Sequence, residues 1–244
     1  MDLAGRSVLV TGGTRGIGKA IALRLVSLGA GRVVLGYFRN DSAAEQAAEE
    51  IRAAGAEPVL VRGNVASEKA VAEFASHGPY AALVHNAATG VIRAALETED
   101  KHWDWTIATN SRALLSLARA CAPDMEPGSS IVAISSLGAT RVLENYILVG
   151  TSKAALESVV RYLAVELAPR GIRVNAVSAS VVETGALEHF PNRDAMLSSI
   201  ERTPAGRLVE PEDIAGAVAY LCSADAEMVR GHTLLVDGGF SLLA

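Results

Sequence analysis

The hydrophobic positions of the chain alternate between two spacings. Short apolar runs, such as residues 8–10, are each followed by a longer segment in which apolar residues recur every three or four positions, for example at Ile21, Leu25 and Leu28. The first spacing is typical of buried strands and the second of amphipathic helices. The pattern predicts strands at 8–10, 32–38, 58–61, 80–84, 130–134, 172–177 and 233–239, and helices from 19 onward, at 42–54, 68–77, 99–125 and 151–168, and from 211 onward.

This order of elements predicts the fold class. Repeated strand–helix units build a doubly wound parallel sheet with helices on both faces. No linker, low-complexity tract or internal repeat interrupts the series. We therefore expect a single α/β domain over residues 1–244.

Composition and charge narrow the classes of partner. The formal net charge is −5 and the basic residues form no cluster, which argues against nucleic acid. No run approaches the roughly 18 to 20 apolar residues of a membrane span, and no signal-peptide region precedes the first strand, so we expect a cytoplasmic protein. Cys121 and Cys222 lie in apolar helical surroundings without ligand spacing. We interpret both as core thiols and expect no metal site.

The turn after the first predicted strand is the first sign of chemistry. Its glycines follow the pattern G-x-x-x-G-x-G and lead into a helix. Glycine permits positive φ angles and close approach of a ligand, and a helix N-terminus offers free N–H groups to an anion. The residues that we predict to hold a pyrophosphate are Gly12, Thr14, Arg15, Gly16, Ile17 and Gly18. The alternative is a glycine cluster that only ends the strand.

The end of the second predicted strand indicates which dinucleotide is bound. An acidic residue at this point accepts from the ribose 2′-hydroxyl of NAD, whereas an arginine accommodates the 2′-phosphate of NADP. Here the strand is followed by Arg39, and Arg15 supplies a second cation from the glycine turn. Guanidinium groups bind phosphate in bidentate fashion, so the pair favours NADPH over two solvated surface arginines.

Several segments together resemble the short-chain dehydrogenase/reductase superfamily: Thr11 with the glycine pattern, Asn86-Ala87 after the fourth strand, Lys153 in the helix after the fifth, and the C-terminal residues 233–239. The resemblance implies a Rossmann-type fold, a substrate lid at about 185–208 and a homotetramer. The further cofactor contacts that it implies are Asn64, Val65, Asn86, Ala87, Lys153, Val181 and Thr184. His85 departs from the superfamily, which has asparagine there, and we interpret it as a structural replacement rather than a catalytic histidine.

The same resemblance implies catalytic roles for three retained residues. Ser136 ends the fifth predicted strand, Lys153 follows in the next helix, and Asn110 lies in the middle of the helix predicted at 99–125. In the superfamily the matching asparagine loosens this helix and holds a water in a proton relay. We interpret the nearby Trp103 and Trp105 as core or subunit contacts rather than a substrate-stacking pair.

The tyrosine of the superfamily is displaced. Its usual position, four residues before Lys153, holds Val149, and the nearby tyrosine is Tyr146, with six residues between it and Lys153. On a helix this places the phenol about 4.5 Å farther from Lys153 along the axis than position 149. Reduction of a conjugated C=C bond adds hydride to the β-carbon while charge develops on a more distant carbonyl oxygen. A displaced phenol suits that reaction.

A Tyr-x6-Lys pair resembles the NADPH-dependent enoyl-[acyl-carrier-protein] reductases. The resemblance implies reduction of a trans-2-enoyl thioester, carried on acyl carrier protein or CoA, with Tyr146 stabilising the enolate. Lys153 is expected to lower the pKa of this phenol, and Ser136 to lack its usual phenol partner. Three alternatives remain open: a 3-oxoacyl thioester reductase, a non-catalytic NADPH-binding regulator, and Tyr146 as an ordinary loop aromatic.

Overall fold

The computed structural model describes residues 3–182 and 203–243. Its strands are β1 (Ser7–Thr11), β2 (Arg32–Tyr37), β3 (Glu57–Arg62), β4 (Ala82–His85), β5 (Ser130–Ser136), β6 (Arg173–Ala179) and β7 (Thr233–Val236). Its main helices are α1 (Gly16–Ser27), α2 (Asp41–Ala53), α3 (Glu68–Ser76), α4 (Asp100–Ile107), α5 (Ala113–Cys121), α6 (Ile147–Glu166) and α8 (Pro211–Cys222).

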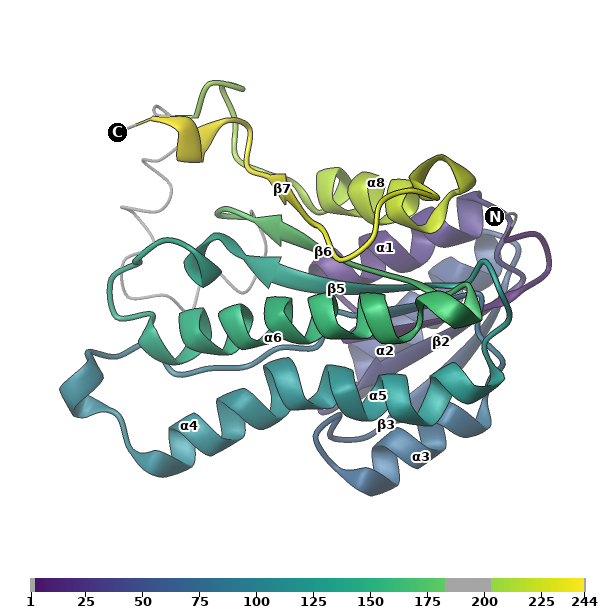
Figure 1. Ribbon diagram of the computed structural model, residues 1–244. Helices are drawn as coiled ribbons and strands as arrows, with labels where there is room; N and C mark the ends of the chain where they lie inside the picture. Colours follow the sequence, from purple (N-terminus) through teal and green to yellow (C-terminus); the bar gives the residue numbers. More distant parts are fainter. Residues whose placement is uncertain (1–2, 183–202, 244) are drawn as a thin grey trace.

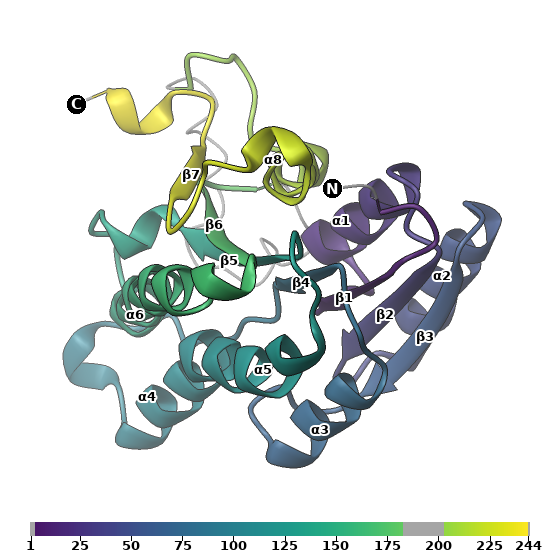
Figure 2. The same cartoon turned by 45° about the vertical axis from the view of Figure 1, so that its right-hand side comes forward.

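The strands form one parallel sheet between two layers of helices, as the sequence predicts. The strand order is β3-β2-β1-β4-β5-β6-β7. Apolar side chains of α1, α2 and α8 pack on one face, and those of α3, α5 and α6 pack on the other (Figures 1 and 2). The chain order reverses between β1 and β4, so these two strands send their connections in opposite directions. In sheets of this kind the ligand crevice lies at that reversal, beyond the carboxyl ends of the strands.

Two predicted helices differ from the structure. The helix predicted at 99–125 is divided into α4 and α5 by a π-helical turn, Ala108–Arg112. The helix predicted from 151 begins at Ile147, so Lys153 lies in its second turn rather than its first. Both differences fall beside the predicted catalytic residues.

Trp103 and Trp105 are 43% and 44% exposed, so they are not core residues of this chain, and their interpretation as subunit contacts stays a prediction. Cys121 and Cys222 are buried free thiols, as predicted. Within residues 3–182 and 203–243, no helix has both the length and the apolar character to cross a membrane. The same residues contain no cluster of three or more His, Cys, Asp or Glu suited to a metal ion.

Candidate active site

Thr11 and Asn86 join the carboxyl ends of β1 and β4. The Thr11 hydroxyl oxygen accepts hydrogen bonds from the backbone N–H groups of Asn86 and Ala87, each at 3.1 Å. The Asn86 side-chain amide donates to the carbonyl oxygens of Thr11 and Gly12, at 3.1 and 3.0 Å. The predicted contact residues Asn86 and Ala87 therefore hold the glycine turn in place at the crevice.

Three positions of the glycine turn, Gly12, Gly16 and Gly18, are unsuited to a larger residue. Gly12 and Gly16 have φ angles of 64° and 49°. A Cβ atom on Gly18 would lie 2.0 Å from the carbonyl oxygen of Gly12, so a side chain there would force the turn apart. Thr14 is buried within the turn, and Ile17 is partly buried.

The N-terminus of α1 is open to an anion. Its N-cap residue, Arg15, makes no side-chain capping bond, and the first turn contains no acidic residue. By contrast, Asn40 caps α2 and Ser67 caps α3 through their side chains. The first N–H groups of a helix lack partners within the helix and attract negative charge. The tight turn and the uncapped helix end fit the pyrophosphate of a dinucleotide.

The arginines predicted to bind a 2′-phosphate are both exposed. The guanidinium of Arg39 lies 5.0 Å from the centre of the Phe38 ring, and neither Arg15 nor Arg39 forms an ion pair within the described part of the chain. The acidic residue nearest in sequence, Asp41, is held elsewhere by an ion pair of 3.2 Å with Arg62. The positive charges of Arg15 and Arg39 are therefore not neutralised by Asp41.

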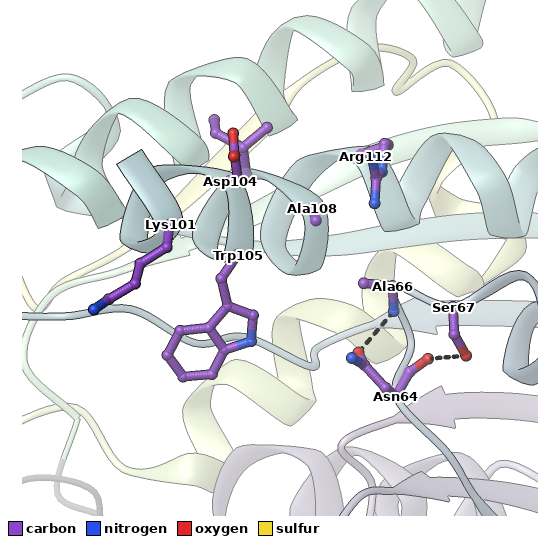
Figure 3. Close-up of a pocket in the computed structure, with 9 residues that line it drawn as sticks. Asn64, Ala66, Ser67, Lys101, Asp104, Trp105, Ala108 and Arg112 are labelled. Carbon is purple, nitrogen blue, oxygen red and sulfur yellow. Dashed lines mark hydrogen bonds between the residues drawn. The ribbon is translucent and has the colours of Figure 1, made fainter. Parts of the chain in front are cut away.

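Asn64 and Val65 follow β3, and Val65 is buried. The Asn64 side-chain oxygen accepts from the Ala66 N–H at 3.0 Å, which shapes the turn into α3. A pocket of about 650 Å³ lies between this turn and α4, where Trp105 extends toward the turn (Figure 3). Ser136, Tyr146 and Lys153 do not line it.

The remaining predicted cofactor contacts lie near the end of the described residues. Val181 follows β6 and is partly buried. Thr184 lies outside the described residues, as do positions 185–202 of the predicted lid. Residues 203–208 of that segment are described, and they lead into α8.

His85 is buried between the glycine turn and the π-helical turn. Its Nδ1 lies 3.2 Å from the Thr11 hydroxyl, and its Nε2 lies 3.1 Å from the Asn110 carbonyl oxygen. Since the Thr11 oxygen already accepts two N–H groups, its O–H donates to Nδ1, and Nε2–H donates to Asn110. Burial, together with the charge of Lys153, lowers the pKa of His85 to about 4. The imidazole is therefore neutral near pH 7, in agreement with its interpretation as a structural residue.

Asn110 lies in the π-helical turn and connects three segments. Its side-chain amide donates to the Thr89 carbonyl oxygen and to the Ser152 hydroxyl, each at 2.8 Å, and its side-chain oxygen accepts from the Thr89 N–H at 2.8 Å. These contacts with the loop after β4 and with α6 explain why the helix does not continue regularly. Ser152, which the sequence analysis did not single out, thereby fixes Asn110 against the helix that carries Lys153.

Tyr146 lies at the N-cap of α6 and faces Ser136 at the end of β5. The two hydroxyl oxygens are 3.5 Å apart, and the Gly138 N–H donates to the serine oxygen at 3.2 Å. A Cβ atom on Gly138 would lie 2.6 Å from the tyrosine ring. Ser136 therefore has a phenol partner in Tyr146, although the position of its usual partner is occupied by Val149, as the sequence shows.

Burial shifts the pKa values of Lys153 and Tyr146 in opposite directions. The Lys153 ammonium is 5% exposed and donates to the Ile134 carbonyl oxygen at 2.6 Å. Burial lowers the pKa of Lys153 to about 8, and the charge of Glu157 opposes this effect. Burial raises the pKa of Tyr146, opposed by its contact with Ser136. The prediction that Lys153 lowers the phenol pKa is thus wrong for this structure, and Tyr146 is a neutral O–H donor near pH 7.

Val149 fills the position where the superfamily has tyrosine. It is buried, and its Cγ2 atom lies 2.2 Å from where a Cβ atom on Gly90 would stand. The space beside the loop after β4 is therefore closed by an apolar contact. Among the described residues near Lys153, Tyr146 is the phenol that the fold brings to Ser136.

Comparisons with known proteins agree with this arrangement. A family model described as Enoyl-(Acyl carrier protein) reductase matches residues 12–241. The chain is 36% identical over 244 residues to the 1-cyclohexenylcarbonyl-CoA reductase of Streptomyces collinus, covering 97% of this chain and 87% of that protein. It is 36% identical over 255 residues to the 3-oxoacyl-[acyl-carrier-protein] reductase of Pseudomonas aeruginosa, covering 98% of each.

Solved structures show the same architecture. A short-chain dehydrogenase/reductase from Serratia marcescens has a TM-score of 0.91 and 32% sequence identity, covering 99% of this chain and 100% of the other. A blue fluorescent protein from a metagenomic library, solved in complex with NADPH, has a TM-score of 0.90 and 30% identity, again covering 99% and 100%.

Proposed function

Because the chain belongs to the short-chain dehydrogenase/reductase superfamily, we propose that it uses NADPH to reduce the carbon–carbon double bond of a trans-2-enoyl thioester. Membership confirms the resemblance at the level of the superfamily, which comprises reductases dependent on a nicotinamide cofactor. The choice of an enoyl thioester is the further step. It depends on where the phenol lies relative to Lys153.

The position of Tyr146 is the observation that carries the proposal. It precedes the first residue of α6, whereas Lys153 lies in the second turn, so about 10 Å of helix axis separates the two backbone positions. The position nearer Lys153 is occupied by Val149, which offers no proton. In a conjugate reduction the oxygen that gains charge is three bonds from the β-carbon that gains hydride, two more than in the reduction of a ketone. A tyrosine whose backbone position is set back from that of Lys153 fits this separation.

Two relatives support a thioester substrate. The Streptomyces collinus protein is named for a CoA thioester with a cyclohexenyl group on its carbonyl, and the Pseudomonas aeruginosa protein for an acyl-carrier-protein thioester. We therefore propose a thioester of acyl carrier protein or CoA as the substrate of this chain.

The residues of the crevice fit NADPH. Residues 12–18 would hold the pyrophosphate, Arg15 and Arg39 the 2′-phosphate, and Asn64 and Val65 the adenine, while Asn86, Ala87, Val181 and Thr184 would contact the remainder of the cofactor. Lys153 would bind the hydroxyls of the nicotinamide ribose. When bound, NADPH supplies the hydride.

The chain's own residues stabilise charge and provide a proton. The neutral Tyr146 phenol donates a hydrogen bond to the thioester carbonyl, and this bond strengthens as the oxygen becomes an enolate. Ser136 keeps the phenol oriented from the other side, as its 3.5 Å contact allows. Asn110 fixes α6 through Ser152, and the α-carbon proton comes from Tyr146 or from water.

Paired substrates test this proposal. We expect crotonyl-CoA to be reduced with NADPH and acetoacetyl-CoA to be turned over much more slowly. The same pair presented on acyl carrier protein identifies the preferred carrier. Turnover of the ketone alone would contradict enoyl reduction, and NADPH binding without consumption of either substrate would support the non-catalytic regulator.

One observation favours a second candidate, a 3-oxoacyl thioester reductase. The contact between Ser136 and Tyr146 pairs a serine with a phenol next to the crevice, and such a pair can also protonate a ketone oxygen. The relative from Pseudomonas aeruginosa is named for that activity. The set-back position of Tyr146 weighs against it, and the paired substrates distinguish the two reactions.

The preference for NADPH is tested at the two exposed arginines. Combining Arg15→Ala with Arg39→Ala should raise the Kd for NADPH by at least about 100-fold and leave the Kd for NADH nearly unchanged, because charge-assisted hydrogen bonds contribute about 1.5–3 kcal/mol each and 1.4 kcal/mol corresponds to a tenfold change in Kd. Binding is measured by titration of cofactor fluorescence. Arg52→Ala, an exposed arginine in the last turn of α2, is the control. Equal weakening of both cofactors would contradict the assignment.

A homotetramer, expected from the resemblance, stays a prediction.

A further inference from the structure

The last three residues of β5 each contact a different residue of the α6 segment. The Ile134 carbonyl oxygen accepts from Lys153 at 2.6 Å, and the Ser136 hydroxyl lies 3.5 Å from that of Tyr146. Between them, the Ser135 hydroxyl donates to the Glu157 carboxylate at 2.6 Å. Two of these contacts hold residues of the proposed reaction. The third holds a carboxylate that the proposed reaction does not use.

Glu157 lies in an unusual place for an acidic residue. It follows Lys153 by one helical turn, so the two side chains share a face of α6. It is 8% exposed and forms no ion pair of 4.0 Å or less with any residue in the described ranges. A hydroxyl-to-carboxylate distance of 2.6 Å is typical of a charge-assisted bond to an ionised acceptor. A buried charge is costly without a compensating charge nearby, and the cation one helical turn from Glu157 is the buried Lys153 ammonium.

We propose that Glu157, held by Ser135, is a positioning residue that keeps the buried Lys153 ammonium charged for its contact with the cofactor ribose. The inference rests on the proposed function, since it concerns the lysine of that same site. Glu157 supplies a negative charge one helical turn from Lys153, while the hydrogen bond to the Ile134 carbonyl oxygen fixes the ammonium.

The charges around Lys153 agree with this role. Burial lowers the pKa of Lys153 to about 8, and Glu157 is the charge that opposes the fall. His85 on β4 also interacts electrostatically with Lys153, and the Tyr146 phenol lies at the start of the same helix; both groups are neutral near pH 7. Without Glu157, no negative charge among the described residues around Lys153 would offset the effect of burial on its pKa. A growing share of the lysine would then be neutral at pH 7.

Glu157→Gln tests the inference, because the amide oxygen can still accept from Ser135 but carries no charge. The chain has four lysines, Lys19, Lys69, Lys101 and Lys153, so an NMR titration of protein labelled with [13Cε]lysine resolves each of them. Lys153→Arg identifies the signal by its loss. We expect the midpoint of Lys153 in Glu157→Gln to fall by about one pH unit or more, since the loss of a nearby opposite charge shifts a pKa by that order. NADPH binding should then weaken at pH 8 and remain close to wild type at pH 6.

Two further variants keep the test decisive. Glu166→Gln removes an exposed charge from the last turn of α6 and should leave the Lys153 midpoint unchanged. Ser135→Ala removes the hydrogen-bond donor of the Glu157 carboxylate and is expected to lower the Lys153 midpoint by less than Glu157→Gln does. This variant provides the test if Glu157→Gln does not fold. An unchanged Lys153 midpoint in a folded Glu157 or Ser135 variant would overturn the inference. The titration needs no substrate, so its result is separate from whether the enzyme reduces enoyl thioesters.

Discussion

Tyr146→Phe lowers turnover of an enoyl thioester about a hundredfold, because it removes one hydrogen bond that is strongest in the transition state. The ring packs on Gly138 without help from the hydroxyl, so the variant keeps its fold. The Kd for NADPH should also be unchanged, since Tyr146 is assigned to the substrate rather than to the cofactor. Steady-state kinetics, fluorescence titration and thermal unfolding measure the three quantities.

Tyr162→Phe is the matched control for this experiment. Tyr162 lies on the same helix but is 70% exposed, and its variant should retain wild-type turnover. If Tyr146→Phe also reduces crotonyl-CoA at the wild-type rate, Tyr146 is an ordinary loop aromatic and the proposed mechanism is wrong. A loss of NADPH binding together with turnover would instead indicate that the ring supports the cofactor site.

Gly18→Ala has the second large effect, the loss of NADPH binding. The added Cβ atom would lie 2.0 Å from the Gly12 carbonyl oxygen, and this neighbour is backbone that can move only if the turn opens. Overpacking of this kind destabilises a protein by about 1–3 kcal/mol. We therefore expect a lower Tm and a Kd for NADPH raised by at least about tenfold, which corresponds to 1.4 kcal/mol.

Gly216→Ala is the control for the glycine substitution. Gly216 lies within α8 with no atom near its potential Cβ position, so alanine should stabilise the helix by up to about 1 kcal/mol and leave NADPH binding unchanged. A folded Gly18→Ala variant with wild-type affinity for NADPH would place the pyrophosphate elsewhere.

The sheet and the cofactor crevice are readable from the sequence because their signals are local. Apolar runs define the strands, and the glycine pattern marks the turn between β1 and α1 without reference to other segments. The chain segments that fix Asn110 are distant from it, so the sequence predicts an unbroken helix where the structure has a π-helical turn. Thr89 and Ser152 hold that turn, and neither is close to Asn110 in sequence.

The proposed catalytic pair shows more clearly that contacts between segments cannot be predicted from local sequence patterns. The spacing of Tyr146 and Lys153 is visible in the sequence, but the start of α6 at Ile147 and the packing of the Tyr146 ring on Gly138 are not. Nor does the sequence predict the contact between Ser136 and Tyr146. Glu157 has a weak signal, since it follows Lys153 at helical spacing, yet acidic side chains are almost always exposed. Its burial becomes evident only from the contact with Ser135.

The fate of deuterium from 4-deuterated NADPH tests the proposed reaction most directly. With crotonyl-CoA as substrate, we predict butyryl-CoA carrying the label on C3, detected by NMR of the product, and a sharp loss of this product in Tyr146→Phe. Crotonyl-CoA left unreduced, while acetoacetyl-CoA becomes labelled 3-hydroxybutyryl-CoA, would contradict reduction of the double bond.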